Sequence, residues 1–417
     1  VDVLTVPFRS FGPVVRVEDR SVIDDPAPSS LETAVVTLQY AGLHGTRESE
    51  ALALWARAQD VFDFRDGVEL FAGVSQNWVV GDVEENLAYF TSGEIPLRAD
   101  LEAGSVVDRP NTLQDGSGPN NWISDPTRFQ GQTIPYQVLA FDEMPQTVNP
   151  ANGFVVTANN DPAGALLDND PLNQYRLGRS SIYYAKDWDN TASLRAGRIT
   201  RLLREKIDAG EKISLDDMKR IQANTQQLDA ELMMPFLLQA GANAEAPGAP
   251  VQLASLAADP GVAEALSRLA AWDFSTPTGI PEGYDASDVD GTRDPEVSPA
   301  EAAASVAATL YTVWRAHAIE STMARAMRAI GVSPLFLQRG YAPLRGLQLL
   351  LSYEPFTGVG ASGIDFFPEP AGLAAEERRD VTLLQALRDA LDDLASSRYD
   401  HAFAGSTDQD DYRWGKL

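Results

Sequence analysis

The segment at residues 141–162, FDEMPQTVNPANGFVVTANNDP, constrains the fold more than any other part of the chain. The Asn-Pro pair at 149–150 and the Asn-Gly pair at 152–153 are turn formers, because Asn and Gly tolerate a positive φ and Pro fixes its own φ. The β-branched and aromatic residues at 154–157 predict a short buried strand. The segment therefore predicts a strand that is bounded by tight turns.

Two carboxamides, Asn159 and Asn160, stand where the predicted strand ends. Side-chain amides aimed at one point can form an oxyanion hole, because they donate hydrogen bonds without adding charge. The alternative is that both amides cap a turn, and spacing alone favours that alternative. The residues by themselves leave both interpretations open.

The composition describes a packed globular protein with an acidic surface. The chain has 417 residues and 44% hydrophobic residues, enough for two or three domains or one large one. A net charge of −27 argues against nucleic-acid binding, which needs a basic surface. No run approaches the roughly 18 apolar residues of a membrane span, and no signal peptide is visible at the start of the chain.

Few residues in the chain suit metal or nucleophile chemistry. There is no cysteine, and His44, His317 and His401 do not cluster, so a His-rich zinc site is not expected. No GxSxG elbow is present either. The residue counts themselves leave a Ser-His-Asp triad open.

Residues 1–192 are predicted to be rich in strands, as part of a sheet core. Strands are expected at 3–8 and 34–39, a helix at 49–64, and a hairpin at 75–98 with its turn at Asp82 to Asn86. Residues 99–135 are rich in Gly, Pro, Asn, Asp and Ser, which predicts a long surface loop.

Residues 193–417 are predicted to be mainly helical. Helices are expected at 195–207, from the Ser214 capping box onward, and at 261–272, 298–330 and 376–397. The leucine stripe of the last helix is assigned to the core. Strands followed by helices indicate an α+β fold.

Two acidic stretches are candidate calcium sites. Asp168 and Asp170 lie in LLDNDPLN, and the segment 284–296 brings together Asp285, Asp288, Asp290 and Asp294 around a glycine. The EF-hand spacing is incomplete and no bidentate Glu ends the second stretch, so a solvated loop is the favoured alternative for both. Asp170 is kept as a candidate ligand of a structural calcium ion, and no organic cofactor is expected.

Arg195 and Arg198 occupy an unusual position near the start of a predicted helix. A helix N-terminus is already positive, so a cation there is unfavourable by a few tenths of a kcal/mol or more, as an order of magnitude. An arginine tolerated at this position is expected to point at a carboxylate or an anion. A plain salt bridge is the alternative.

Several segments together resemble the penicillin acylase (penicillin amidase) family of N-terminal-nucleophile hydrolases. SQNWVVGDVEENLAY at 75–89 is similar to the family's SQNFVYADVDGNIGY-type hairpin, and GEIPLR at 93–98, the segment at 141–161 and RAGRITRLL at 195–203 are similar in wording and order. The resemblance runs from about Ser10 to the end of the chain and is weakest between 240 and 300.

The resemblance implies the family's αββα core and amide hydrolysis by a serine whose own α-amino group is the base. It implies that Asn159 is the oxyanion-hole side chain and that Arg195 organises this asparagine. Gln76, and with less support Leu52, would face the acyl pocket. It also implies a periplasmic or extracellular location and, as partners, the remaining segments or subunits of the same precursor together with a small amide substrate.

One departure from the family concerns the nucleophile. The chain begins with Val1 and lacks the family's SNNW-type start; PNNW at 119–122 imitates it, but Ser117 nearby has a blocked amino group. We therefore expect this chain to be an internal part of a longer acylase, with the serine upstream, and to be inactive alone. The alternative is a non-catalytic scaffold or binding module.

Overall fold

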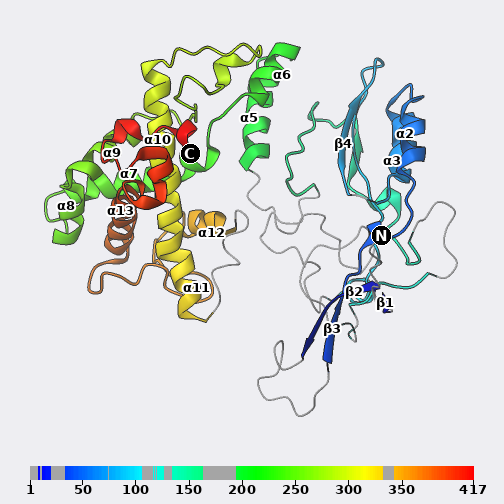
Figure 1. The fold of residues 1–417 in the computed structure, drawn as a ribbon, viewed down its shortest axis with the longest axis horizontal. Helices are drawn as coiled ribbons and strands as arrows, with labels where there is room; N and C mark the ends of the chain where they lie inside the picture. Colours follow the sequence, from blue (N-terminus) through cyan, green and yellow to red (C-terminus); the bar gives the residue numbers. More distant parts are fainter. Residues whose placement is uncertain are drawn as a thin grey trace, which may run out of the picture. The chain divides into compact units, whose positions relative to one another are not determined.

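The computed structural model describes ten ranges of the chain: 8–9, 12–19, 33–73, 75–105, 116, 118, 120–125, 134–162, 194–331 and 342–417. The chain forms two compact units (Figure 1). The first unit comprises Val1–Thr157 and Asp161–Lys186, and the second comprises Ala158–Asn160 and Asp187–Leu417. Among the described residues, strands lie in the first unit and most helices in the second, which confirms the expected α+β mixture of strands and helices.

The described residues of the first unit form two small antiparallel sheets of three strands each. One sheet has the order β1-β2-β3, from Phe8–Arg9, Gly12–Asp19 and Thr33–Thr37. The other has the order β4-β5-β6, from Asn77–Gly81, Leu87–Thr91 and Gln146–Val148. The strand predicted at 34–39 is confirmed as β3, whereas most of the strand predicted at 3–8 lies outside the described residues.

The β4–β5 hairpin forms where the sequence predicts it. The side chain of Asp82 accepts hydrogen bonds from the amides of Glu84 at 3.0 Å and Asn86 at 2.9 Å, which closes the turn. Asn77 pairs with Thr91 across the ladder. Ala88 and Phe90 on β5 are fully buried, so the hydrophobic effect fixes the register.

The helix predicted at 49–64 is two helices, α2 (Glu48–Trp55) and α3 (Val61–Leu70), so the prediction of one helix is wrong. Asp60 starts α3 by accepting the amides of Phe62 and Asp63, both at 2.8 Å. The break lets Trp55 stack on Phe64 with ring centroids 4.8 Å apart. Stacking across the break outweighs continuation of the helical pattern.

The stretch at 99–135, predicted to be a surface loop, is packed in several of its described parts. It begins with a short helix, α4 (Ala99–Glu102), and isolated bridges join Arg98 to Trp122 and Ser124 to Tyr136. Leu101 is fully buried. The described parts of this stretch are therefore not a loop that lies wholly on the surface.

The second unit is helical. Its main helices are α5 (Leu194–Asp208), α6 (Leu215–Gln222), α7 (Leu228–Glu245), α8 (Val251–Ala257), α9 (Pro260–Ala270), α10 (Pro299–Ile319), α11 (Arg325–Ala329), α12 (Ala342–Leu351) and α13 (Ala375–Leu394). Helices α5, α6, α9, α10 and α13 confirm the sequence predictions, while α7, α8 and α12 were not predicted.

The core of this unit is built around α10, α13 and α7, which lie together in Figure 1. The leucine stripe of α13 is confirmed as core, since Leu383, Leu384 and Leu387 are fully buried. Helix α10 begins with a capping box: Glu301 donates its amide to Ser298 Oγ, and its carboxylate accepts the Ser298 amide at 2.8 Å. Local caps fix where this helix starts, and burial fixes its face.

A π-helical turn, η4 (Glu320–Ala324), separates α10 from α11. The amide of Arg325 bonds the carbonyl of Glu320, five residues earlier, which adds one residue to the turn. The long helix predicted at 298–330 is therefore confirmed in extent but interrupted near its end. Such turns shift the face that the following side chains occupy.

The capping box of α6 makes stability depend on pH. Hydrogen bonds from the amide and hydroxyl of Ser214, followed by Lys206, lower the pKa of Asp217 from 3.8 to about 2. Because the folded pKa is depressed, this contribution is present above about pH 4 and is lost as pH falls towards about 2.

We expect Asp217→Asn to remove that contribution. The gap in melting temperature between wild type and variant should be largest near neutral pH and shrink as pH falls through this window. Circular dichroism melts at a series of pH values measure it. Parallel pH profiles for the two proteins would contradict the assignment.

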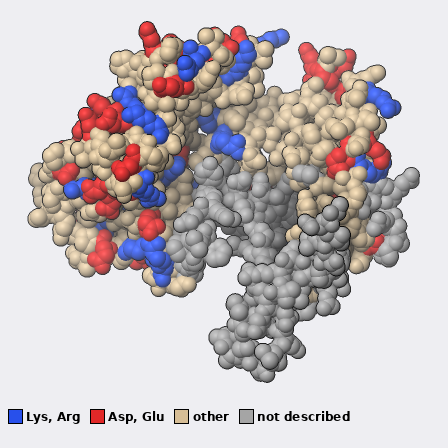
Figure 2. Space-filling view, viewed as in Figure 1, with Lys and Arg blue, Asp and Glu red and all other residues tan. Residues whose placement is uncertain are grey.

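The surface carries charges of both signs. On the face shown in Figure 2, acidic and basic side chains alternate over the helices of the second unit. Together with the net charge of −27, this arrangement is typical of a solvated acidic surface. Within the described ranges, no helix combines the length and apolar character that a membrane span requires.

Candidate active site

The segment at 141–162 forms its predicted turns but not its predicted strand. Asn149 and Gly153 have φ values of +50° and +75°, which confirms both turn formers. Asn149 also ties the turn to β5, since its side-chain oxygen accepts the Leu87 amide at 2.9 Å. Residues 154–157 are partly buried and belong to no strand, because β6 ends at Val148 and the turns lead the chain off the sheet.

A tight turn follows at Ala158–Asn160. Asn159 has a φ of +56°, a conformation that Asn tolerates better than most residues. The side-chain oxygen of Asn160 accepts the Ala158 amide at 2.9 Å. The turn-cap interpretation is therefore confirmed for Asn160, and the two amides have different surroundings.

Arg195 holds the same turn from the first turn of α5. Its Nη2 donates to Asn159 Oδ1 at 2.7 Å and to the Ala158 carbonyl at 2.8 Å. The acceptors are a carboxamide and a backbone carbonyl, so the carboxylate or salt bridge expected for this arginine is not found among the described residues. Neutral oxygens are suitable acceptors because a guanidinium can only donate.

This contact orients the Asn159 side chain. Because arginine has no acceptor, the atom facing it must be Oδ1, and the NH2 group then faces away. Among the described residues, nothing accepts a hydrogen bond from Asn159 Nδ2. Both side chains are exposed. The arrangement presents a neutral N–H donor whose direction is set by a cation 36 residues further along the chain.

Helix α5 is itself anchored at the same end. Arg198 donates through Nε to Asn224 Oδ1 at 3.0 Å and through Nη2 to the side-chain oxygen of Gln226. At Gly197, an added Cβ would lie 2.9 Å from the Leu228 side chain, so glycine allows the close approach of α7. Asn224 and Gln226 were not predicted from the sequence as partners of Arg198. Their only sequence signal is a run of polar residues between two helices.

The predicted acyl-pocket residues lie in the first unit. Gln76 immediately precedes β4, where its backbone amide bonds Ser92 Oγ at 3.3 Å, and its side chain is exposed. Leu52 lies on α2 and is 58% exposed. The structure brings Asn159 and Arg195 together within the second unit, and the roles of Gln76 and Leu52 stay predictions.

Of the predicted calcium ligands, Asp168 and Asp170 lie outside the described ranges. Ser117, which was considered as a nucleophile, lies outside them too. In the part of the chain that is described, no three acidic or histidine side chains are grouped so as to hold a metal ion. In the segment 284–296, Asp288 instead accepts the amides of Asp285 at 2.9 Å and Asp294 at 2.7 Å, which lowers its pKa.

Comparison with known proteins agrees with this architecture. The sequence matches the penicillin amidase family over residues 1–417. The fold is similar to that of a thermostable penicillin G acylase from Alcaligenes faecalis, with a TM-score of 0.53 and 17% identity. The similarity covers 99% of this chain and 59% of that one, so the chain spans less than two thirds of the acylase's length. The chain belongs to the penicillin amidase family.

Proposed function

We propose that this chain is part of an amide hydrolase of the acylase type, in which Asn159 donates a side-chain N–H to the oxyanion. The observation that carries the proposal is the bond from Arg195 to Asn159 Oδ1, which leaves Nδ2 directed away from the arginine. As the acyl carbon becomes tetrahedral, its oxygen gains charge, and a neutral donor placed there is worth about 3 kcal/mol of barrier.

The nucleophile in this proposal is a serine that lies upstream of this chain and acts through its own free α-amino group. Attack by its oxygen forms an acyl-enzyme and releases the amine; water then releases the acid. The proposal draws on family membership and on the 59% coverage of the similar acylase. The sheets of the first unit would form part of the family's αββα core, in a secreted or periplasmic protein processed from a precursor.

The test of the serine step uses the full-length protein and a panel of chromogenic anilides with aromatic, aliphatic and long-chain acyl groups. We expect turnover of at least one anilide, and mass spectrometry of the trapped acyl-enzyme should place the acyl group on an N-terminal serine. Ser117→Ala should leave turnover unchanged. Acylation of Ser117 would overturn the proposal of an upstream serine. No turnover of any anilide by the processed protein would overturn the proposed activity and favour a non-catalytic scaffold.

Arg195 is a positioning residue in this proposal, and Arg195→Lys tests that role. Lysine keeps the charge, but its side chain is shorter and its ammonium rotates freely, so it should hold the two oxygens less well; kcat should fall by about 10-fold to 100-fold while KM changes little. Arg204→Lys, on the exposed surface of the same helix, is the matched control and should behave like wild type. A fall in both variants alike would indicate a general loss of α5 stability.

A further inference from the structure

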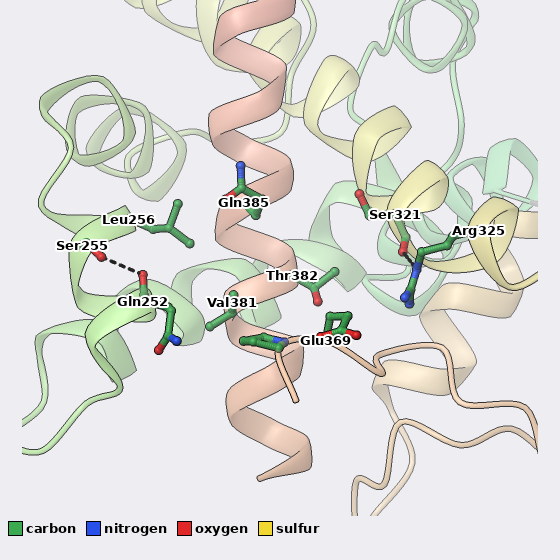
Figure 3. A pocket seen from close by; sticks show the side chains of 10 residues that line it. Gln252, Ser255, Leu256, Ser321, Arg325, Glu369, Val381, Thr382 and Gln385 are labelled. Carbon is green, nitrogen blue, oxygen red and sulfur yellow. Dashed lines mark hydrogen bonds between the residues drawn. The ribbon is translucent and has the colours of Figure 1, made fainter. Parts of the chain in front are cut away.

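The second unit contains a hollow that is not part of the Asn159 turn. Its volume is about 600 Å³, within the range that holds small organic ligands. Figure 3 shows its walls: α8 on one side, α13 in the middle, and η4 with α11 on the other side. The lining is mostly apolar, with Leu256, Val381 and Pro370 and the stems of longer side chains.

Most hydroxyl groups in the hollow are already used by their own helices. Ser255 Oγ donates to the Val251 carbonyl at 2.6 Å, and Thr382 Oγ1 donates to the Arg378 carbonyl at 2.8 Å. Such hydroxyls offer little hydrogen-bond donation to a ligand. The hollow also has the carboxamides of Gln252 and Gln385, and its one charged donor among the lining residues is Arg325.

Arg325 is held in place by two backbone carbonyls. Its Nε donates to the Ser321 carbonyl and its Nη2 to the Phe366 carbonyl, both at 2.7 Å. A guanidinium has five N–H groups, and two of them are used by these carbonyls. Among the described residues nothing accepts the other three, which can therefore bind a ligand. No carboxylate of the described residues forms an ion pair with it.

The surroundings of Arg325 favour a single negative charge. Burial lowers the pKa of its guanidinium, and the nearby carboxylates of Asp365 and Glu369 offset this only in part. Glu369 lies at the rim, where it accepts the Ala371 amide at 3.0 Å. One cation with an acid at the rim suits a monocarboxylate better than a doubly charged phosphate, and the apolar walls suit a hydrocarbon body.

The π-helical turn explains why the arginine faces this hollow. The extra residue of η4 shifts the register between α10 and α11, and Ser321 and Arg325 line the hollow together. Turns of this kind recur at functional sites. From the hollow, the anchored guanidinium and the turn, we propose that the second unit binds a small apolar carboxylic acid, with Arg325 as the carboxylate-binding residue.

The proposal is tested by calorimetric titration of the 417-residue chain with hexanoate, its uncharged analogue hexanamide, and inorganic phosphate. We expect saturable binding of hexanoate with a Kd of about 1 mM, and binding of hexanamide and phosphate that is at least about tenfold weaker. Equal binding of hexanoate and hexanamide, preferred binding of phosphate, or no saturable binding of hexanoate would overturn the proposal.

Two variants locate the site. Arg325→Met should weaken hexanoate binding by at least about tenfold, while Arg328→Met, which loses an exposed pair with Glu320, should bind like wild type. Because Arg325→Met could disturb folding, Val381→Trp fills the hollow from α13 and should abolish binding with Arg325 intact. Asn159→Gly should bind hexanoate normally. If Arg325→Met and Val381→Trp both bind hexanoate like wild type, the carboxylate binds elsewhere. The same conclusion follows if only Asn159→Gly loses binding.

Discussion

Asn159→Gly in the full-length protein should lower kcat by about 10²–10³-fold, with KM little changed. Glycine removes the Nδ2 donor but accepts the φ of +56° without strain, so the turn itself should persist. The loss follows because the donor acts on charge that develops only in the transition state. Steady-state kinetics with the most active chromogenic anilide measures the effect.

Asn159→Asp is the sharper companion variant. It keeps an oxygen for Arg195 to bind but replaces the NH2 donor with a second oxygen, so kcat should fall at least as far as in Asn159→Gly. Melting temperatures close to wild type would show that neither variant acts through unfolding. An unchanged kcat in Asn159→Gly would remove Asn159 from the oxyanion hole.

Asp229→Ala should destabilise the helical unit by about 2–3 kcal/mol, because it leaves the buried Tyr311 hydroxyl and the partly buried Arg315 guanidinium without their partner. Asp229 lies on α7 and is 5% exposed. Tyr311 on α10 donates to Asp229 Oδ2 at 2.8 Å, and Arg315 pairs with the same oxygen. Burial and the charge of Asp229 raise the pKa of Tyr311 well above its ordinary value. Burial lowers the pKa of Arg315, but the charge of Asp229 counteracts this, and the pKa is raised overall.

Urea denaturation followed by circular dichroism measures this effect, with Tyr311→Phe as the control. That control removes one hydrogen bond and keeps the ring, so it should cost only about 1 kcal/mol. If Asp229→Ala costs no more than Tyr311→Phe, the three side chains do not form the coupled group described here.

Local sequence signals predicted the elements whose causes are local. The β4–β5 hairpin follows from Asp82 in its turn, and α6 and α10 begin where Ser214 and Ser298 cap them. Each of these contacts joins residues within four positions of each other. Such interactions can be predicted from sequence because they involve only neighbouring residues and do not depend on tertiary packing.

Elements set by packing were predicted less well. Helix α7 was missed because it is buried over much of its surface and contains Pro235, so it shows neither a polar face nor an uninterrupted helical pattern. The helix predicted at 49–64 divides at the Asp60 cap, and the two parts pack together through Trp55 stacked on Phe64. The segment predicted as a strand at 154–157 has suitable residues but pairs with no strand among the described residues, and a strand needs a partner to form.

The sequence by itself determined the family resemblance, the change from strands to helices along the chain, and the choice of Asn159 and Arg195 as candidate site residues. Only the tertiary structure decided how the two meet: Arg195 takes the oxygen of Asn159 and leaves the NH2 group facing away. It also decided that Arg198 is anchored by two amides, and that Arg325 lines a hollow formed by segments far apart in the chain. The physical reason is that the direction of a donor depends on long-range packing and hydrogen bonding, which residue types and spacing do not specify.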